Sequence, residues 1–227
     1  MVILHETEHW LVLDKPSGIA TTSTLPGEQT LHSMVLAKYP NAQRAHPLSR
    51  LDVEVSGAIV FAMSKQAIAK AEHAQRERAL HKVYHALTPR IELDKDFFWE
   101  FSIAQDPNDP LRRVISPDGD PAKTDGTSIK RSRSGMLLAL RPLTGRTHQL
   151  RLHCAHAGCP IWGDQKYGGA KRLALSDGAM VQVPRTMLHC ARVDMDGEFS
   201  AESYWPEDFR AIGLAGELWS EASLANH

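Results

Sequence analysis

The sequence predicts an α+β fold: a mixed, mainly antiparallel sheet flanked by helices, with a cleft across its middle. Two patterns support this. Short apolar runs rich in β-branched residues and bounded by turn residues are typical of buried strands. Apolar residues at helical spacing behind a serine or threonine cap are typical of amphipathic helices. We find no internal repeat and no low-complexity linker, so the simplest division of residues 1–227 is a single domain.

Composition places the chain among ordinary globular proteins. It is 42% hydrophobic and 23% charged, which argues against a disordered protein. No apolar run approaches the roughly 20 residues needed to cross a bilayer, and the first residues do not read as a secretion signal. The three cysteines are odd in number, which favours free thiols in a reducing compartment. We therefore expect a cytoplasmic protein without a membrane association.

Charge is unevenly distributed along the chain. Residues 194–227 hold eight acidic residues and one arginine, a net charge of −7. Because the whole chain carries −1, residues 1–193 carry +6. A basic body with an acidic C-terminal segment is compatible with a phosphate-binding face, although scattered solvated charge accounts for the numbers equally well.

The first elements are a strand, a turn and a short helix. Trp10 to Leu13 is an apolar strand that runs into the turn-forming cluster Asp14 to Gly18. Thr30 is expected to cap a helix from Leu31 to Tyr39.

The centre of the chain combines a buried strand with a charged loop. Ala58 to Met63 is an apolar run expected to lie in the core, and Asp52 falls in the loop that leads into it. A carboxylate there is rigidly supported yet reachable, which suits a nucleophile. Ser64 then caps a longer helix that reaches about Arg78.

Further strands follow in the second half. The alternating stretch His81 to Leu87 contains Tyr84, and Lys130 to Arg133 is read as a solvated hairpin. Met136 to Leu140 and Leu188 to Ala191 are expected to be strands. Between these two, Thr147 is expected to cap a helix starting near His148, with Arg151 one turn further on.

Four segments in one order resemble the RluA-type RNA pseudouridine synthases. They are DKPSGI at 14–19, RLD followed by SG at 50–57, K-x-Y-x-A at 82–86, and TGRTHQLRLHCAHAGCPIWGDQKYGG at 144–169. A late Leu188-His189 matches a further family motif that looks structural. Four ordered matches across most of the chain are difficult to obtain by chance.

The resemblance implies three catalytic residues. Asp52 is the nucleophile, and the family leaves open whether it attacks the ribose or the uracil ring. Tyr84 stacks on the target uracil and helps to remove the proton from its carbon-5. Arg151 pairs with Asp52, and a nearby cation keeps a nucleophilic carboxylate ionised.

Four substrate-binding residues are also implied. Arg50 enters the helix stack when the target base leaves it, at a cost of a few kcal/mol. Arg146 and His148 contact the RNA backbone and support the cleft, which Lys15 borders.

The resemblance further implies the pseudouridine synthase catalytic fold and a uridine in ribosomal or transfer RNA as the target. Loop or single-stranded RNA is favoured because its unstacked bases are accessible. The reaction has no redox change and no net hydrolysis, so we expect no cofactor and no metal. We also expect a monomer without the small N-terminal RNA-binding module that such families often add, since the matches begin near Trp10.

Two positions depart from the family pattern. Ser49 stands where the family usually has histidine, and Val55 where it usually has threonine. The first leaves open how the loop is buttressed, and the second removes a hydroxyl near the nucleophile.

Three alternatives were weighed against this interpretation. A nucleosidase or glycosidase would need a second carboxyl group facing Asp52, and Glu54 on a strand-like stretch would not face it. A catalytically silent RNA-binding protein on the same fold is the second. The third is a zinc site, disfavoured because Gln149 stands where a histidine-glutamate zinc motif needs its base. Its candidate ligands are His148, His153, Cys154, His156, Cys159, His189 and Cys190.

Overall fold

A computed structural model of the chain describes residues 1–23, 25, 27–40, 45–174 and 178–219. The chain divides into two compact units, each built from two separate segments. Unit 1 comprises Met1–Val83 and His189–Tyr204, and unit 2 comprises Tyr84–Leu188 and the chain from Trp205 onward.

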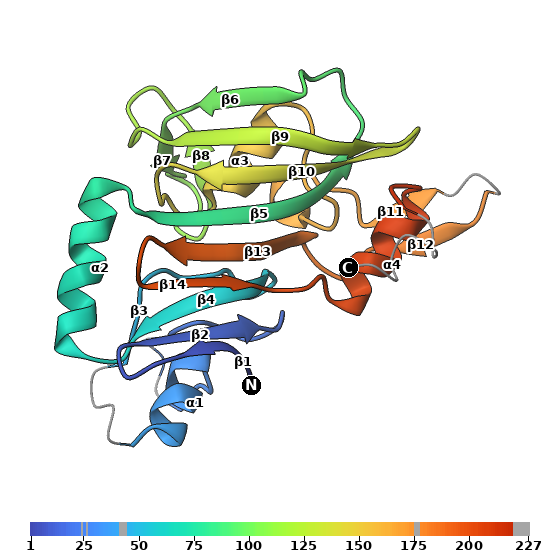
Figure 1. Ribbon diagram of the computed structural model, residues 1–227. Coiled ribbons are helices and arrows are strands. Elements are labelled where there is room, and N and C mark those ends of the chain that lie inside the picture. The colour runs from blue at the N-terminus through green and yellow to red at the C-terminus, as the bar shows by residue number, and fades with distance from the viewer. Residues whose placement is uncertain (24, 26, 41–44, 175–177, 220–227) are drawn as a thin grey trace. The chain divides into compact units, whose positions relative to one another are not determined.

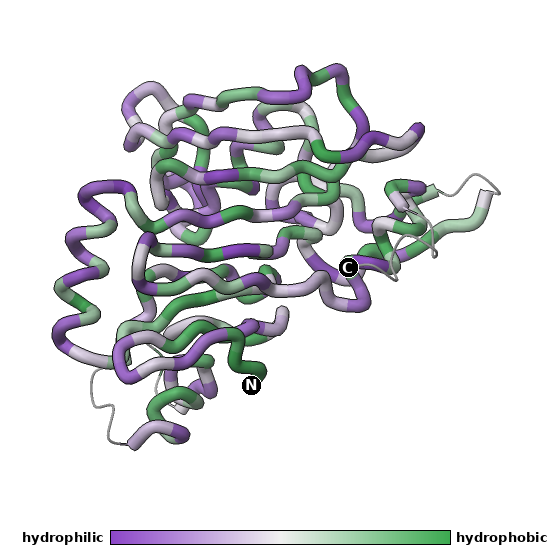
Figure 2. Tube along the Cα trace, viewed as in Figure 1, coloured by the Kyte–Doolittle hydropathy of each residue, from purple (hydrophilic) through white to green (hydrophobic). Residues whose placement is uncertain are grey.

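Unit 1 is a mixed sheet (Figure 1). β2 pairs antiparallel with β1 and β4, β3 pairs antiparallel with β4, and β13 pairs parallel with β4 and antiparallel with β14. The strands are β1 (Val2–Glu6), β2 (Trp10–Lys15), β3 (His46–Pro47), β4 (Ser56–Ala62), β13 (Leu188–Met195) and β14 (Phe199–Glu202). All seven residues of β4 are buried, as the predicted core strand requires, and Figure 2 draws this strand largely as hydrophobic.

The two helices of unit 1 start at the predicted caps. In α1 (Leu31–Lys38) the Thr30 and Ser33 side chains bond reciprocally to each other's backbone N–H, a capping box. In α2 (Lys65–Glu77) the Ser64 hydroxyl accepts from the Ala67 N–H. Figure 2 shows mainly hydrophilic residues along α2, whose buried residues are three alanines.

Unit 2 is built on an antiparallel sheet in the order β5-β10-β9-β6. These strands are β5 (Leu80–Pro89), which enters the unit at Tyr84, β10 (Gly135–Pro142), β9 (Lys123–Arg131) and β6 (Asp96–Glu100). Two small hairpins are β7 (Ile103–Gln105) with β8 (Arg113–Ile115) and β11 (Arg172–Ala174) with β12 (Met180–Gln182). The helices are α3 (Gln149–His156), the short 3-10 helix η1 (Gln165–Tyr167) and α4 (Glu207–Ala215).

Residues of α3 and η1 contribute to the buried core of unit 2. The first six residues of β10, from Gly135 to Leu140, are all buried. Leu152 of α3 and Tyr167 of η1 join Ile103 and Ala122 in a second apolar cluster. The Trp205 and Trp219 rings stack with centroids 4.7 Å apart. Trp219 Nε1 also donates to the Arg210 carbonyl at 3.0 Å, which fastens the end of the described chain to α4.

The strands and the first two helices confirm the sequence predictions, and the sheets are mixed and mainly antiparallel as expected. The helix expected to start near His148 does so, since α3 begins at Gln149, but its predicted Thr147 cap was wrong: the residue before α3 is His148 in the left-handed region (φ 57°), and no side chain caps the helix. The single-domain division stays a prediction. The last acidic residue of the C-terminal segment, Glu221, lies outside the described residues. None of the helices in the described part of the chain is long and apolar enough to cross a bilayer.

Gly57 is the tightest point of unit 1 and generates a prediction. Its φ is +113°, and a Cβ there would lie 2.3 Å from the Cys190 carbonyl oxygen on β13. Gly57→Ala should therefore lower the free energy of unfolding by about 3 kcal/mol or more, from backbone strain and overpacking together. Urea denaturation monitored by circular dichroism measures this. Gly145→Ala is the control, because a Cβ at Gly145 meets nothing within 4 Å. Equal losses of unfolding free energy in the two variants would show that the close approach of Gly57 to β13 does not limit the residue at this position.

Candidate functional site

The loop that carries Asp52 is tied to the N-terminal turn of unit 1. The Thr21 hydroxyl donates to the Leu51 carbonyl (3.0 Å) and accepts from the Leu51 N–H (3.1 Å). The Gly18 N–H donates to the Val53 carbonyl at 2.7 Å. These bonds flank Asp52 on both sides, so the half-buried carboxylate sits on a fixed backbone. The loop placement predicted for Asp52 is confirmed.

Lys15 reinforces the same connection. Its side chain is fully buried, and its Nζ donates to the carbonyls of Pro16 (2.9 Å) and Val53 (3.4 Å). A buried ammonium has to be compensated by acceptors, and these two carbonyls of the two loops are among them. The structure therefore gives Lys15 a role in joining the loops, and its contact with RNA stays a prediction.

A chain of polar groups holds the end of the loop. The Ser56 hydroxyl lies 2.9 Å from His189 Nδ1, and His189 Nε2 lies 3.0 Å from the Ser203 carbonyl. The Ser203 hydroxyl in turn donates to Asp14 Oδ1 at 2.9 Å. Ser56 and His189 are buried, and they are register partners in the parallel pairing of β4 with β13. The structural interpretation of Leu188-His189 is thus confirmed, and this linkage connects three of the motifs.

The side chains around Asp52 differ in exposure. Arg50, Val53 and Glu54 are exposed, whereas Leu51 and Val55 are buried. Residues 53 and 54 form a turn, so the strand-like stretch assumed for Glu54 was wrong: the Val55 N–H donates to the Asp52 carbonyl, and the chain turns before β4 begins. The Arg50 guanidinium forms no hydrogen bond or ion pair with any residue that the structure describes.

In unit 2 the Gln149 side chain organises the turn before α3. Its Oε1 accepts from the Thr144 hydroxyl (2.7 Å) and the Arg146 N–H (3.1 Å). Its Nε2 donates to the Lys123 carbonyl (2.9 Å) and the Thr124 hydroxyl (3.1 Å). The buried amide thus closes the turn that precedes α3, and no N–H group of α3 itself is among these partners.

Arg151 is held by a carboxylate that the sequence analysis did not single out. Its Nε donates to Asp164 Oδ2 at 2.7 Å and its Nη2 to Asp164 Oδ1 at 2.6 Å. Both side chains are buried, Asp164 completely. A bidentate fork of this kind fixes the plane of the guanidinium as well as its position.

Tyr167 brings His148 and Arg151 together. The Arg151 guanidinium lies 5.3 Å from the centre of the tyrosine ring, and His148 Nδ1 lies 2.7 Å from the hydroxyl. The same hydroxyl accepts from the Arg113 N–H at 3.0 Å. Burial raises the pKa of the Tyr167 phenol, so the hydroxyl keeps its proton at neutral pH.

The remaining predicted residues lie at distinct places. Tyr84 is a buried residue of β5, in register with Leu140 of β10. Arg146 is more exposed: its Nε donates to the Pro121 carbonyl (3.2 Å), and its Nη1 lies 3.7 Å from Asp120. The structure thus groups Lys15 and Asp52 in unit 1, and His148 and Arg151 in unit 2.

Asp164 and Tyr167 were missed as site residues. Both belong to the closing motif GDQKYGG, which was quoted for its resemblance without a role for its side chains. The aspartate and tyrosine stand three residues apart around η1, a spacing that brings both to one turn. That spacing was the available signal.

The histidine and cysteine residues weighed as zinc ligands are distributed as packed groups. Cys154 and Cys159 are buried free thiols. His153 is fully buried with Nε2 3.2 Å from the Phe101 carbonyl, and burial lowers its pKa. Within the described ranges, no three of these residues gather their donor atoms in the way a metal requires.

Comparison with known proteins decides the family. A family model described as RNA pseudouridylate synthase matches residues 9–156. The chain belongs to this family. The dual-specificity RNA pseudouridine synthase RluA of Salmonella typhi is 33% identical over 196 residues, which cover 83% of this chain and 84% of that protein. The uncharacterized RNA pseudouridine synthase YhcT of Bacillus subtilis is 33% identical over 222 residues, 92% of this chain and 70% of that protein.

Solved structures show the same fold. Human RNA pseudouridylate synthase domain containing 4 superimposes with a TM-score of 0.76 at 22% identity, covering 96% of this chain and 94% of that one. Human RNA pseudouridylate synthase domain containing 1 gives a TM-score of 0.73 at 23% identity, covering 99% and 93%. The predicted family, its catalytic fold and its class, an RNA-modifying isomerase, are therefore confirmed.

The Arg151–Asp164 pair yields a prediction with an internal control. Asp164→Asn removes one charge of a buried pair and should cost about 3–5 kcal/mol of unfolding free energy. Asp125→Asn makes the same change at the exposed Arg141–Asp125 pair, also in unit 2, and should cost less than about 1 kcal/mol. Chemical denaturation of both variants is the measurement. A loss at Asp164 no larger than at Asp125 would show that the buried pair contributes little.

Proposed function

We propose that this RNA pseudouridine synthase isomerises a specific uridine in ribosomal or transfer RNA, with Asp52 as its nucleophile. The observation that supports Asp52 most directly is its loop, in which the residues on both sides of the carboxylate are bound to the turn 15–21. A nucleophile has to be held in a reactive position before the substrate arrives, because orientation lowers the barrier.

The chemistry is an internal rearrangement. The bond from ribose C1′ to uracil N1 breaks, the base rotates while Asp52 holds one of the two fragments, and C1′ is rejoined to carbon-5. The proton on carbon-5 is lost, and N1 gains one, so atoms and charge balance without an oxidant or net water. The reaction therefore needs residues that position the fragments and move one proton.

Arg151 and Tyr84 are proposed to supply these functions. In the family pattern Arg151 pairs with the nucleophile, and its guanidinium is already oriented by Asp164 and by the Tyr167 ring. Such a cation keeps a carboxylate ionised. Tyr84 is proposed to stack on the uracil and to assist removal of the carbon-5 proton.

The substrate has to present its uridine outside the helical stack. We propose that Arg50 fills the space that the flipped base leaves. Its guanidinium is exposed and bonds to none of the described residues, so it can move into the RNA without first losing such a bond. Arg146 and His148 are proposed to contact the RNA backbone. We further propose a loop or single-stranded target, a monomeric enzyme and a cytoplasmic location, where these RNAs are processed.

The decisive test is Asp52→Asn. The variant keeps the size of the side chain and loses the charge of the nucleophile, so pseudouridine formation should fall below detection while RNA affinity stays within about twofold. Glu54→Gln is the matched control, an exposed carboxylate two residues away, and it should retain activity. Conversion of radiolabelled uridine in total RNA from a deletion strain measures both. Near-normal turnover by Asp52→Asn, or release of free uracil by the wild type, would overturn the proposal.

Arg50 is tested by the shape of the RNA. Arg50→Ala should slow single-turnover conversion of a stem-loop about tenfold or more relative to an unstructured strand of the same sequence, because little unstacking is needed there. Arg76→Ala, on the exposed face of α2, should leave both rates unchanged. Equal slowing of the two RNAs by Arg50→Ala would remove this residue from the flipping step.

A further inference from the structure

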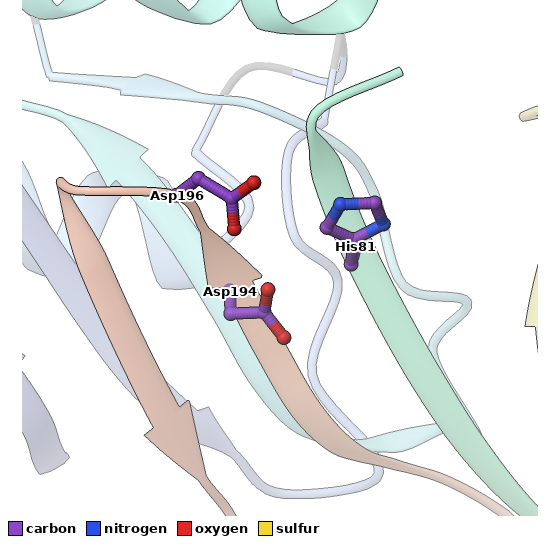
Figure 3. Close-up of side chains that lie close together, drawn as sticks. All are labelled: His81, Asp194 and Asp196. Carbon is purple, nitrogen blue, oxygen red and sulfur yellow. The ribbon is translucent and has the colours of Figure 1, made fainter.

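One cluster of potential metal ligands lies outside the proposed catalytic residues. His81 of β5, Asp194 of β13 and Asp196 of the turn that follows have one donor atom each within 4.8 Å of the others. Figure 3 shows both carboxylates gathered beside the imidazole ring. All three residues belong to unit 1, and they come from segments more than a hundred residues apart in the sequence. The fold therefore creates this grouping.

The backbone that presents the two carboxylates is fixed from both sides. Asp194 Oδ1 accepts from Arg192 Nε at 3.2 Å, and Asp194 is paired in register with Ser200 of β14. The turn with Asp196 is anchored through Glu198, whose carboxylate accepts from Trp10 Nε1 (2.8 Å) and pairs with Lys70. Because the turn is already ordered, its residues lose less conformational entropy when they bind a ligand, which favours binding.

Two of the three side chains are available. Those of His81 and Asp196 are exposed and form no hydrogen bond or ion pair with another described residue, whereas the Asp194 carboxylate already pairs with Arg192 through Oδ1. Two carboxylates at this separation repel each other, so the arrangement favours a cation between them. An imidazole that faces the same point adds a nitrogen ligand, which a simple acidic patch would lack.

We propose that His81, Asp194 and Asp196 form a binding site for a divalent transition-metal ion of the zinc type. One nitrogen and two carboxylate oxygens suit Zn²⁺, whereas Mg²⁺ and Ca²⁺ prefer oxygen ligands alone. Around a tetrahedral ion, bonds of about 2.0–2.2 Å place neighbouring ligands about 3.3–3.6 Å apart. The donor atoms, which lie within 4.8 Å of one another, therefore have to approach by at most about 1.5 Å, and rotation of the side chains supplies this movement. Water fills the remaining positions.

The bound ion would join β5 to the turn between β13 and β14. Because the unfolded chain does not hold these three donors together, binding stabilises the native state by mass action. The site takes no part in the isomerisation, which needs no Lewis acid. Removing the metal should therefore change thermal stability and leave the rate of pseudouridine formation unaltered at assay temperature.

The test is zinc titration of the full chain after EDTA treatment and buffer exchange. At pH 7.5 isothermal titration calorimetry should detect one zinc site, and ZnCl₂ should raise the melting temperature. His81→Ala and Asp196→Asn should each weaken this site at least about tenfold, since even changes to outer-sphere residues weaken metal sites by this factor. Both side chains are exposed, and circular dichroism confirms that the variants fold.

His73→Ala and Asp118→Asn are matched controls, an exposed histidine and an exposed aspartate outside the cluster, and both should bind zinc like the wild type. Millimolar MgCl₂ should fail to displace the zinc. The proposal is overturned if the two cluster variants retain wild-type affinity, if the wild type binds no zinc, or if magnesium displaces it. None of these outcomes bears on Asp52, so this test and the test of catalysis fail independently.

Discussion

The buried pair between Arg151 and Asp164 is the interaction on which unit 2 depends most. Two charges taken out of water require close, well-aligned partners, and here two hydrogen bonds of 2.6 and 2.7 Å provide them. The aspartate occupies its position because its neighbours are glycines. A Cβ at Gly163 would lie 1.8 Å from the Arg185 carbonyl oxygen, and one at Gly169 would lie 1.9 Å from that of Ile161. The local backbone and the ion pair therefore require each other.

In unit 1 hydrogen bonds to the backbone hold the loop that carries the proposed nucleophile, Asp52. The Asp52 loop has little regular structure, yet its carbonyls and amides bind Thr21, Gly18 and the Lys15 ammonium. Its exit is fixed by the Ser56–His189 contact and by the close approach of Gly57 to β13. The motifs at 14–19 and 50–57, together with His189, thus form one supporting framework in unit 1, in which each holds another in place.

Much of this arrangement was accessible from the sequence, and the failures have a physical pattern. Strands such as β4 and helices capped by Thr30 and Ser64 follow from local patterns, and these predictions were confirmed. The Thr147 cap was wrong because His148, in the left-handed region, directly precedes α3. The turn before it is closed by Gln149, whose partners Lys123 and Thr124 lie on a distant strand. Local rules do not detect such partners. The family resemblance supplied candidate roles for Asp52 and Arg151, and it could not indicate that Asp164 orients the arginine. The burial of Lys15 depends on the packed fold and could not be predicted from the local sequence.

The contact between Tyr167 and His148 has a consequence for the polarity of the histidine. The tyrosine oxygen already accepts the Arg113 N–H, and its own proton finds His148 Nδ1 as the acceptor among the described residues. The phenol hydroxyl therefore determines which nitrogen of a neutral His148 ring carries the hydrogen, and a residue of η1 sets the polarity of the residue that precedes α3.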